Sequence, residues 1–153
     1  MNQANVAIAL SWLGLALGAP FFSWLGRNWH DDVRALGYGL AGQLLLLLVL
    51  VGMPIQQIGV AGPVLFLFGF FTGTSMLPFA IAGSAVDVRY IGTSAALVNG
   101  SQFLAGAFLV FIPGYLMRHG DTLAVSQTLY VLPLAMLLAT LLYVYWRTSR
   151  KAA

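Results

Sequence analysis

Two side-chain amides three positions apart, those of Asn99 and Gln102, are the groups in this sequence whose chemistry best suits binding a small molecule. In a helix they share one face, and because a neutral amide both donates and accepts hydrogen bonds, the pair can hold a polar solute. The stretch 92–114 around them has no charged residue and, at about 1.5 Å per residue, would be about 34 Å long, enough to cross a bilayer. Since an amide in hydrocarbon needs a partner, this span is predicted to belong to a helical bundle with a polar interior.

Two hydroxyl residues of the preceding apolar segment, Thr72 and Ser75, are further candidates for lining a solute path. Beside them stand Gly69, Gly73 and Pro78, residue types that allow a membrane helix to bend. A structural alternative stays open for the hydroxyls and for the amides. Hydroxyls in a membrane helix commonly bond back to their own backbone carbonyls, and buried amides commonly bridge neighbouring helices.

Small residues at a helix interface let two membrane helices approach closely. On this basis the sequence predicts four packing glycines in the two segments, namely Gly69, Gly73, Gly100 and Gly106. A third amide, Gln43, lies in a leucine-rich segment. We expect it to form structural hydrogen bonds rather than to contact solute.

The apolar segments carry no side chain suited to catalysis or to moving charge. No Asp, Glu, His, Lys or Arg lies inside any of them, so they provide no proton carrier. The sequence has no cysteine and no Ser/His/Asp set, metal-ligand cluster or phosphate-binding glycine loop. We therefore expect no enzyme activity, no cofactor and no metal site.

The composition requires a membrane around these residues. The chain has 153 residues, of which 60% are hydrophobic and only 7% charged, whereas soluble domains average about 25% charged. The N-terminal apolar stretch lacks the basic start of a secretory signal, so it is interpreted as a true span. The predicted fold is a single all-α membrane domain over 1–153, a bundle of five transmembrane helices at roughly 4–26, 35–53, 58–84, 91–117 and 122–146.

The basic residues predict how this bundle is oriented. Six of the seven fall on one side if the spans alternate, and only Arg118 falls on the other. By the positive-inside rule the C-terminus is predicted to be cytoplasmic and the N-terminus to lie outside. Because the basic residues are scattered among loops and form no basic face, nucleic acid is not an expected partner.

Two stretches resemble a known family. Gly18-Ala19-Pro20 followed by Gly26-Arg27 resembles the loop motif in the second half of the major facilitator superfamily, a glycine-proline helix end that leads into a short cytoplasmic loop. Gly92-Thr93-Ser94-Ala95, with Asn99 and then Gly106-Ala107, is similar to the eleventh span of bacterial members. Phe22, Ser23 and Trp24 stand where the family usually has an acidic and a basic residue before the Gly-Arg pair.

The resemblance covers the whole chain and implies that its segments correspond to spans eight to twelve of such a transporter, in a bacterial inner membrane. Asn99 and Gln102 would then lie near the midplane on a cavity-lining helix. The implied function is secondary transport of a small solute by alternating access, with the missing N-terminal half or another copy of the chain as partner. The alternative is a non-transporting remnant or scaffold that packs with other membrane proteins.

Overall fold

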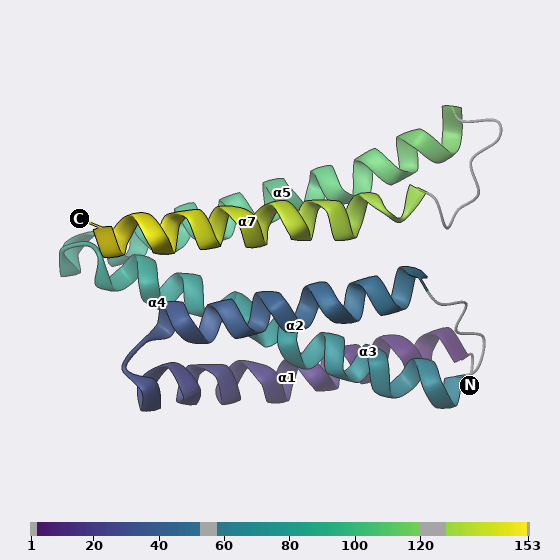
Figure 1. Cartoon of the computed structure of the whole chain (residues 1–153), viewed down its shortest axis with the longest axis horizontal. Helices are drawn as coiled ribbons and strands as arrows, with labels where there is room; N and C mark the ends of the chain where they lie inside the picture. The colour runs from purple at the N-terminus through teal and green to yellow at the C-terminus, as the bar shows by residue number, and fades with distance from the viewer. Residues whose placement is uncertain (1–2, 53–57, 120–127, 153) are drawn as a thin grey trace.

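The computed structural model describes residues 3–52, 58–119 and 128–152, which form helices and contain no strand. Figure 1 shows the helices running roughly alongside one another in a bundle. Their bounds are α1 Gln3–Trp29, α2 Asp32–Gly52, α3 Ile58–Thr72, α4 Leu77–Ser84, α5 Ile91–His119 and α7 Val131–Ala152, with short 3₁₀ segments η1 Gly73–Met76 and η2 Val88–Tyr90.

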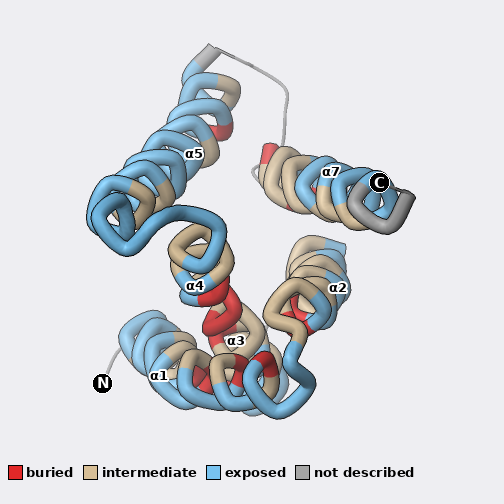
Figure 2. The backbone as a smooth tube through the Cα atoms, turned by 90° about the vertical axis from the view of Figure 1, so that its left-hand side faces the viewer, coloured by how far each residue is buried: buried red, intermediate tan, exposed pale blue. Residues whose placement is uncertain are grey.

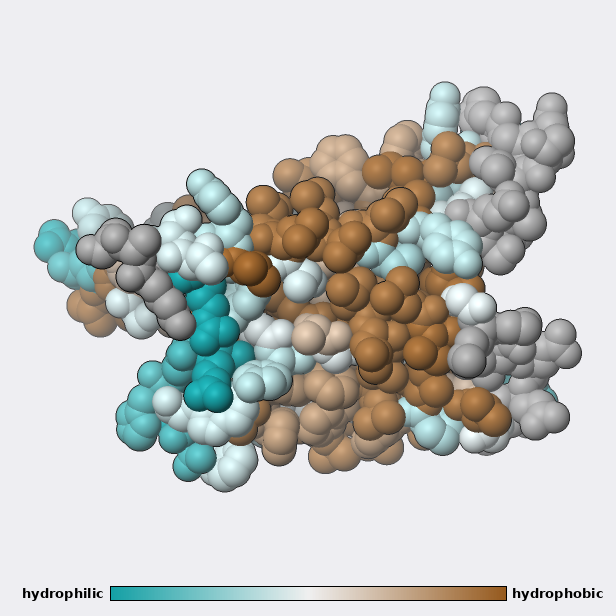
Figure 3. Space-filling model, viewed as in Figure 1, coloured by the Kyte–Doolittle hydropathy of each residue, from teal (hydrophilic) through white to brown (hydrophobic). Residues whose placement is uncertain are grey.

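Five of the helical stretches are long and apolar enough to cross a membrane, with α3, η1 and α4 forming one of them together. The chain is therefore an all-α integral membrane protein whose surroundings are a lipid bilayer. The hydrophobic band across the middle of Figure 3 agrees with this, because it is the surface that hydrocarbon would cover.

The last helix differs from its predicted bounds. The sequence predicts a span at 122–146, whereas α7 begins at Val131 and continues to Ala152, and residues 120–127 lie outside the described parts. Pro133 in the first turn suits a helix start. The basic tail continues the helix because Arg and Lys are good helix formers and are favoured near a helix C-terminus.

The closest helix contact lies between α1 and α3 and depends on glycine on both sides. Gly14 and Gly18 on α1 are four residues apart, as are Gly69 and Gly73 on the α3 side. A Cβ at any of the four would overlap a backbone atom of the opposite helix. This spacing places each pair on one helix face, so the two backbones meet without side chains between them, as small-residue motifs allow in membranes.

A small aromatic core lies beside this contact. Phe22, Ala35 and Leu77 are fully buried, from α1, α2 and α4. The ring of Phe22 packs at 5.6 Å from that of Phe70 and at 5.8 Å from that of Phe71, measured between centroids. In Figure 2 the buried positions accordingly gather where these four helices meet, whereas the outer faces are exposed. The core therefore fixes α1 to α4 as one packed unit.

The proline of Gly18-Ala19-Pro20 does not end the helix, because α1 continues through it to Trp29, three residues beyond the predicted span of 4–26. One proline removes one backbone donor, but ending a helix inside hydrocarbon would leave several groups without partners. The helix ends instead in a Schellman motif, where His30 has φ 53° and its N–H donates to the Arg27 carbonyl at 3.2 Å. The Asp31 N–H donates to the Gly26 carbonyl at 3.1 Å, so Gly26 and Arg27 act through their backbone in this turn.

Helix α5 stands apart from the packed unit. Figure 2 shows α5 and α7 on one side of the molecule, with α4 between α5 and the α1–α3 pair. No residue of the most apolar part of the α5 span is buried. Gly100 and Gly106 are predicted to pack helices, but in this chain a Cβ at either position would meet no atom within 4 Å. The prediction fails for contacts within the described chain because no helix of it lies against that face.

Candidate functional site

Two of the polar residues predicted from the sequence, Gln102 and Ser75, meet where α5 passes the junction between α3 and α4. The side-chain amide nitrogen of Gln102 donates to the backbone carbonyl of Ser75 at 3.1 Å. Two of the predicted site residues, from segments 27 positions apart, are thus brought together. The contact joins α5 to the short segment η1, which interrupts the helix on the other side.

The interruption at η1 has a local cause in the sequence. An α-helix would pair the Thr74 carbonyl with the N–H of residue 78, but that residue is proline and has no N–H. The carbonyl instead accepts from the Leu77 N–H, which tightens the backbone into a 3₁₀ turn. The turn leaves the Ser75 carbonyl directed at α5, where the Gln102 amide reaches it.

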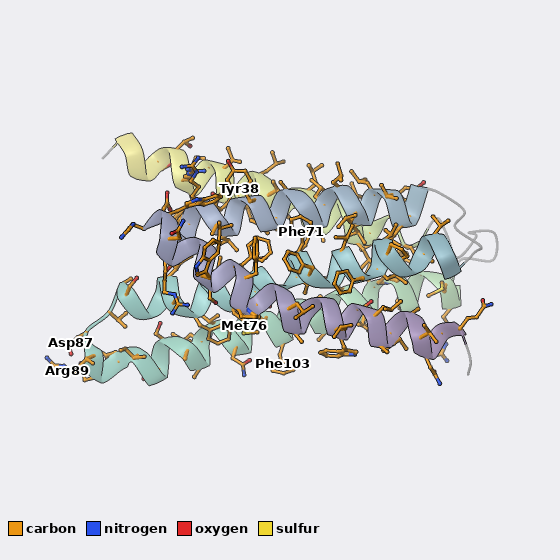
Figure 4. The ribbon with its side chains drawn as sticks, turned by 90° about the horizontal axis from the view of Figure 1, so that it is seen from below. Tyr38, Phe71, Met76, Asp87, Arg89 and Phe103 are labelled. Carbon is orange, nitrogen blue, oxygen red and sulfur yellow. The ribbon has the colours of Figure 1, made fainter. Side chains whose placement is uncertain are left out.

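Asn99 lies one turn before Gln102 on the same helix. Together with Phe103 and Gly106 the two amides border an open groove of about 600 Å³ along α5. Figure 4 shows Phe103 and Met76, from α5 and η1, on the same side of the bundle. The side chain of Asn99 is exposed and makes no hydrogen bond to another described residue. Its amide is therefore the free polar group of the groove.

Thr72 does not join this group through its hydroxyl. Its Oγ1 donates to the Phe68 carbonyl at 2.8 Å, four residues earlier on its own helix. The Ser101 hydroxyl likewise donates to the Val98 carbonyl at 2.8 Å. These bonds have the back-bonding geometry that the structural alternative describes for membrane hydroxyls.

A further polar contact, centred on Gln43, lies deeper in the bundle. The Gln43 amide nitrogen donates to the Phe71 carbonyl at 2.9 Å and to the Thr74 hydroxyl at 3.0 Å. The Thr74 hydroxyl donates in turn to the Phe71 carbonyl at 2.7 Å and is buried. Gln43 therefore forms structural hydrogen bonds from α2 to α3 and η1. The side chain of Thr74 lies against the buried Gly39, in the space that a Cβ at that position would take.

Gln43 also borders a largely apolar cavity that sequence reasoning missed. The cavity measures about 510 Å³ and lies between α2, α3, α5 and α7. It arises because α5 and α7 do not pack closely against the α1–α4 unit along this stretch. In the sequence, the signal near this cavity is Gln43, a single amide in a leucine-rich segment. No local sequence pattern predicts that four helices surround it.

The charged end of the molecule has a separate cavity of about 770 Å³, bordered by His30, Asp31 and Asp32 together with α4 and α7. Asp31 is engaged as a helix cap, since its carboxylate accepts from the Arg34 N–H at 2.7 Å. Among the described residues no group of three or more His, Asp, Glu or Cys is placed to hold a metal ion.

The turn between α4 and α5 contains the other acidic group at this end. The Asp87 carboxylate accepts from the Arg89 side chain at 3.2 Å and from the Arg89 N–H at 3.1 Å. These two bonds hold the pKa of Asp87 below its ordinary value. Figure 4 shows the pair at the tip of the turn, far from the labelled Phe103.

The fold and the site define a polytopic α-helical membrane protein with a small uncharged polar site on one of its spans. No protein-family model, curated protein or solved structure matches the chain. Its function is therefore argued from the site.

Proposed function

We propose that this chain is one part of a membrane transporter that moves a small polar solute by alternating access. The observation that carries the proposal is the polar strip on α5, where the Gln102 amide bonds to η1 at 3.1 Å while the neighbouring Asn99 amide stays free. A free amide next to a helix interruption can exchange its hydrogen bonds with a neutral solute. The resemblance of this span to a cavity-lining helix of the major facilitator superfamily supports the same proposal.

The exposure of α5 supports a role within a larger transporter. An amide in hydrocarbon without a partner is costly, and the Asn99 side chain has none in the described chain. The open space beside Gly100 and Gly106 fits the backbone of another membrane helix. We propose that a second membrane-spanning half covers this strip, with a second copy of this chain as the other possible occupant, and that the solute lies between them.

The interruption at η1 provides the movable element of this proposal. Pro78 and the 3₁₀ turn separate α4 from α3, and discontinuous helices commonly change their bend in transporters. Since α4 packs against α5, a change of angle at η1 would move α5 relative to the glycine-packed α1–α3 pair. The Gln102–Ser75 bond would then break on one side of the cycle and reform on the other.

The orientation and the compartment also belong to the proposal. The α1–α2 turn, the α4–α5 turn and the C-terminus lie at one end of the bundle (Figure 1). These segments contain Arg27, Arg34, Arg89 and Arg147. We propose that this end is cytoplasmic, in a bacterial inner membrane, because basic residues favour that side. Reporter fusions after Trp29 and at the C-terminus would test it.

Cysteine accessibility tests the site directly, because the chain has no native cysteine. Asn99→Cys and Gln102→Cys should react with a membrane-impermeant maleimide when the presumed second half is present, and solute should protect them. Leu138→Cys, an exposed position on α7, is the matched control and should not react, because lipid surrounds it. If neither position on α5 reacts from either side of the membrane, the site assignment fails.

A scaffold that packs with other membrane proteins is the second candidate, and the exposed apolar side chains along α5, such as Phe103 at 74% and Val110 at 77%, favour it. Uptake assays separate the two candidates. Vesicles that contain this chain together with its second half should take up solute, whereas vesicles with either part alone should not. Absence of uptake despite correct insertion of both parts would favour the scaffold.

A further inference from the structure

Two arginines that are far apart in the sequence line one groove between α2 and α7. Arg34 lies in the first turn of α2 and Arg147 near the end of α7, and with Tyr38 and Tyr143 they border a groove of about 610 Å³. Figure 3 shows a hydrophilic patch over this end of α2 and α7, directly beside the hydrophobic band. The groove therefore lies at the level where a lipid head group meets its acyl chains.

Arg147 is held in place by the contact between the two helices. Its Nη1 donates to the Tyr143 hydroxyl at 3.2 Å, and that hydroxyl donates to the Val33 carbonyl at 2.8 Å. The phenol ring crosses α2 at Gly37, where a Cβ would overlap it. The missing side chain of Gly37 thus lets Tyr143 reach α2, and Tyr143 in turn fixes the guanidinium of Arg147.

Arg34 is held from the other side by aromatic rings. Its guanidinium carbon lies 5.0 Å from the centre of the Trp29 ring and 6.0 Å from that of Tyr38, which are cation–π distances. Neither Arg34 nor Arg147 has a carboxylate within ion-pair distance in the parts of the chain that the structure describes. Asp31 and Asp32 border the other cavity at this end instead. The Asp31 carboxylate accepts from the backbone N–H of Arg34 and not from its guanidinium, so the two cations of the groove are held without an ion pair to a described carboxylate.

We propose that this groove binds the phosphate of an anionic glycerophospholipid. Two guanidinium groups on facing helices can each donate paired hydrogen bonds to phosphate oxygens, and basic pockets between membrane helices bind lipid head groups in this way. The apolar residues Ala41 and Val144 lie in the same groove, and the exposed Leu45 and Leu137 stand one helical turn further into the membrane on α2 and α7. This apolar continuation favours a lipid over free phosphate, because it matches acyl chains below a charged head group.

The experiment measures binding of phosphatidylglycerol to the whole chain in neutral detergent by native mass spectrometry, with phosphatidylcholine as the zwitterionic comparison. Phosphatidylglycerol should bind more tightly. The double variant R34Q/R147Q should weaken its binding about tenfold or more, since each basic residue near an anionic lipid contributes substantially to the attraction. The variant R34K/R147K keeps both charges but loses the planar donor geometry, and it should bind severalfold more weakly than the parent.

The matched control is R27Q/R89Q, which removes the same charge from the same end of the bundle but from outside the groove. It should leave binding of phosphatidylglycerol within about twofold of the parent. Equal losses in the two glutamine variants would overturn the proposal in favour of a general surface-charge effect. Equal binding of the two lipids, or unchanged binding in R34K/R147K, would also overturn it. Inorganic phosphate that binds alone with the same dependence on Arg34 and Arg147 would identify a free-anion site and overturn the lipid assignment.

Discussion

Replacing Gly18 by alanine should separate the tightest helix pair of the molecule. A Cβ at this position would overlap the Phe70 carbonyl oxygen and lie 2.7 Å from its carbon. Because those atoms belong to the α3 backbone, they cannot rotate away as a side chain can. The helices must therefore move apart, and the Phe22–Phe70 ring contact at 5.6 Å loosens with them.

The expected loss of stability follows from these contacts. Overpacking of a close interface costs about 1–3 kcal/mol, and a weakened aromatic pair adds about 0.5–1.5 kcal/mol. We therefore expect Gly18→Ala to lower the free energy of unfolding by about 1.5–4.5 kcal/mol. This is a large part of the roughly 5–15 kcal/mol by which folded domains are stable. Gly106→Ala is the matched control, since its Cβ would meet nothing within 4 Å.

Unfolding by SDS in mixed micelles, followed by tryptophan fluorescence, measures both variants. Trp24 is one of four tryptophans, and its ring lies 6.1 Å from that of Phe21, which in turn lies 5.1 Å from that of Phe70 on α3. A variant with the other three tryptophans replaced by Phe makes the emission report on this contact. Gly106→Ala should change the free energy by at most about 1 kcal/mol, in the stabilising direction. If Gly18→Ala proves as stable as Gly106→Ala, then the backbones of α1 and α3 do not meet closely at Gly18.

Three further changes have expected outcomes. Gln43→Leu should lower stability by about 1 kcal/mol in the same SDS assay, because the amide's bonds to Phe71 and Thr74 are lost; an unchanged midpoint would contradict this. His30→Gly should raise stability by up to about 1 kcal/mol, since φ 53° suits glycine, and a lower midpoint would count against it. Asp87 has a lowered pKa, so its contribution to the α4–α5 turn is present above the ordinary aspartate pKa and is lost as pH falls through the lowered one; the protection factor of the Arg89 amide in hydrogen exchange should fall only in that acidic range, and should be low at every pH in Asp87→Ala, which has no side-chain acceptor.

The existence and number of the spans could be predicted from the sequence because hydropathy acts over some twenty residues at once. The boundaries were less predictable where local chemistry was ambiguous. The first span is predicted to end at residue 26, where the charged stretch begins, yet α1 continues to Trp29 before the turn at His30 closes it. The start of α7 at Val131 also departs from the predicted position, since the segment before it is apolar enough to extend the pattern.

The site was predictable only in its parts. The amides at Asn99 and Gln102 stand out because uncharged polar groups are rare in such segments, but nothing local indicates that Gln102 would bond to the Ser75 backbone. That contact depends on how α5 crosses η1. The glycines show the same limit, because nothing in the local sequence distinguishes Gly69 from Gly106. Only the fold places one against the backbone of Ser11 and the other beside open space.

The segment η1 links the packing of the bundle to the proposed site. Gly73 contacts α1 through its backbone, Thr74 accepts the Gln43 amide in the core, and the Ser75 carbonyl accepts Gln102 from α5. Three consecutive residues thus contact three different helices, and a 3₁₀ turn fixes their directions. A displacement of η1 that releases the Gln102 bond would therefore also disturb the core contact of Thr74 or the glycine contact of Gly73. The three contacts of η1 therefore couple the α1–α3 packing and the buried core to the polar contact on α5, and under the proposed function a shift of η1 would alter all three.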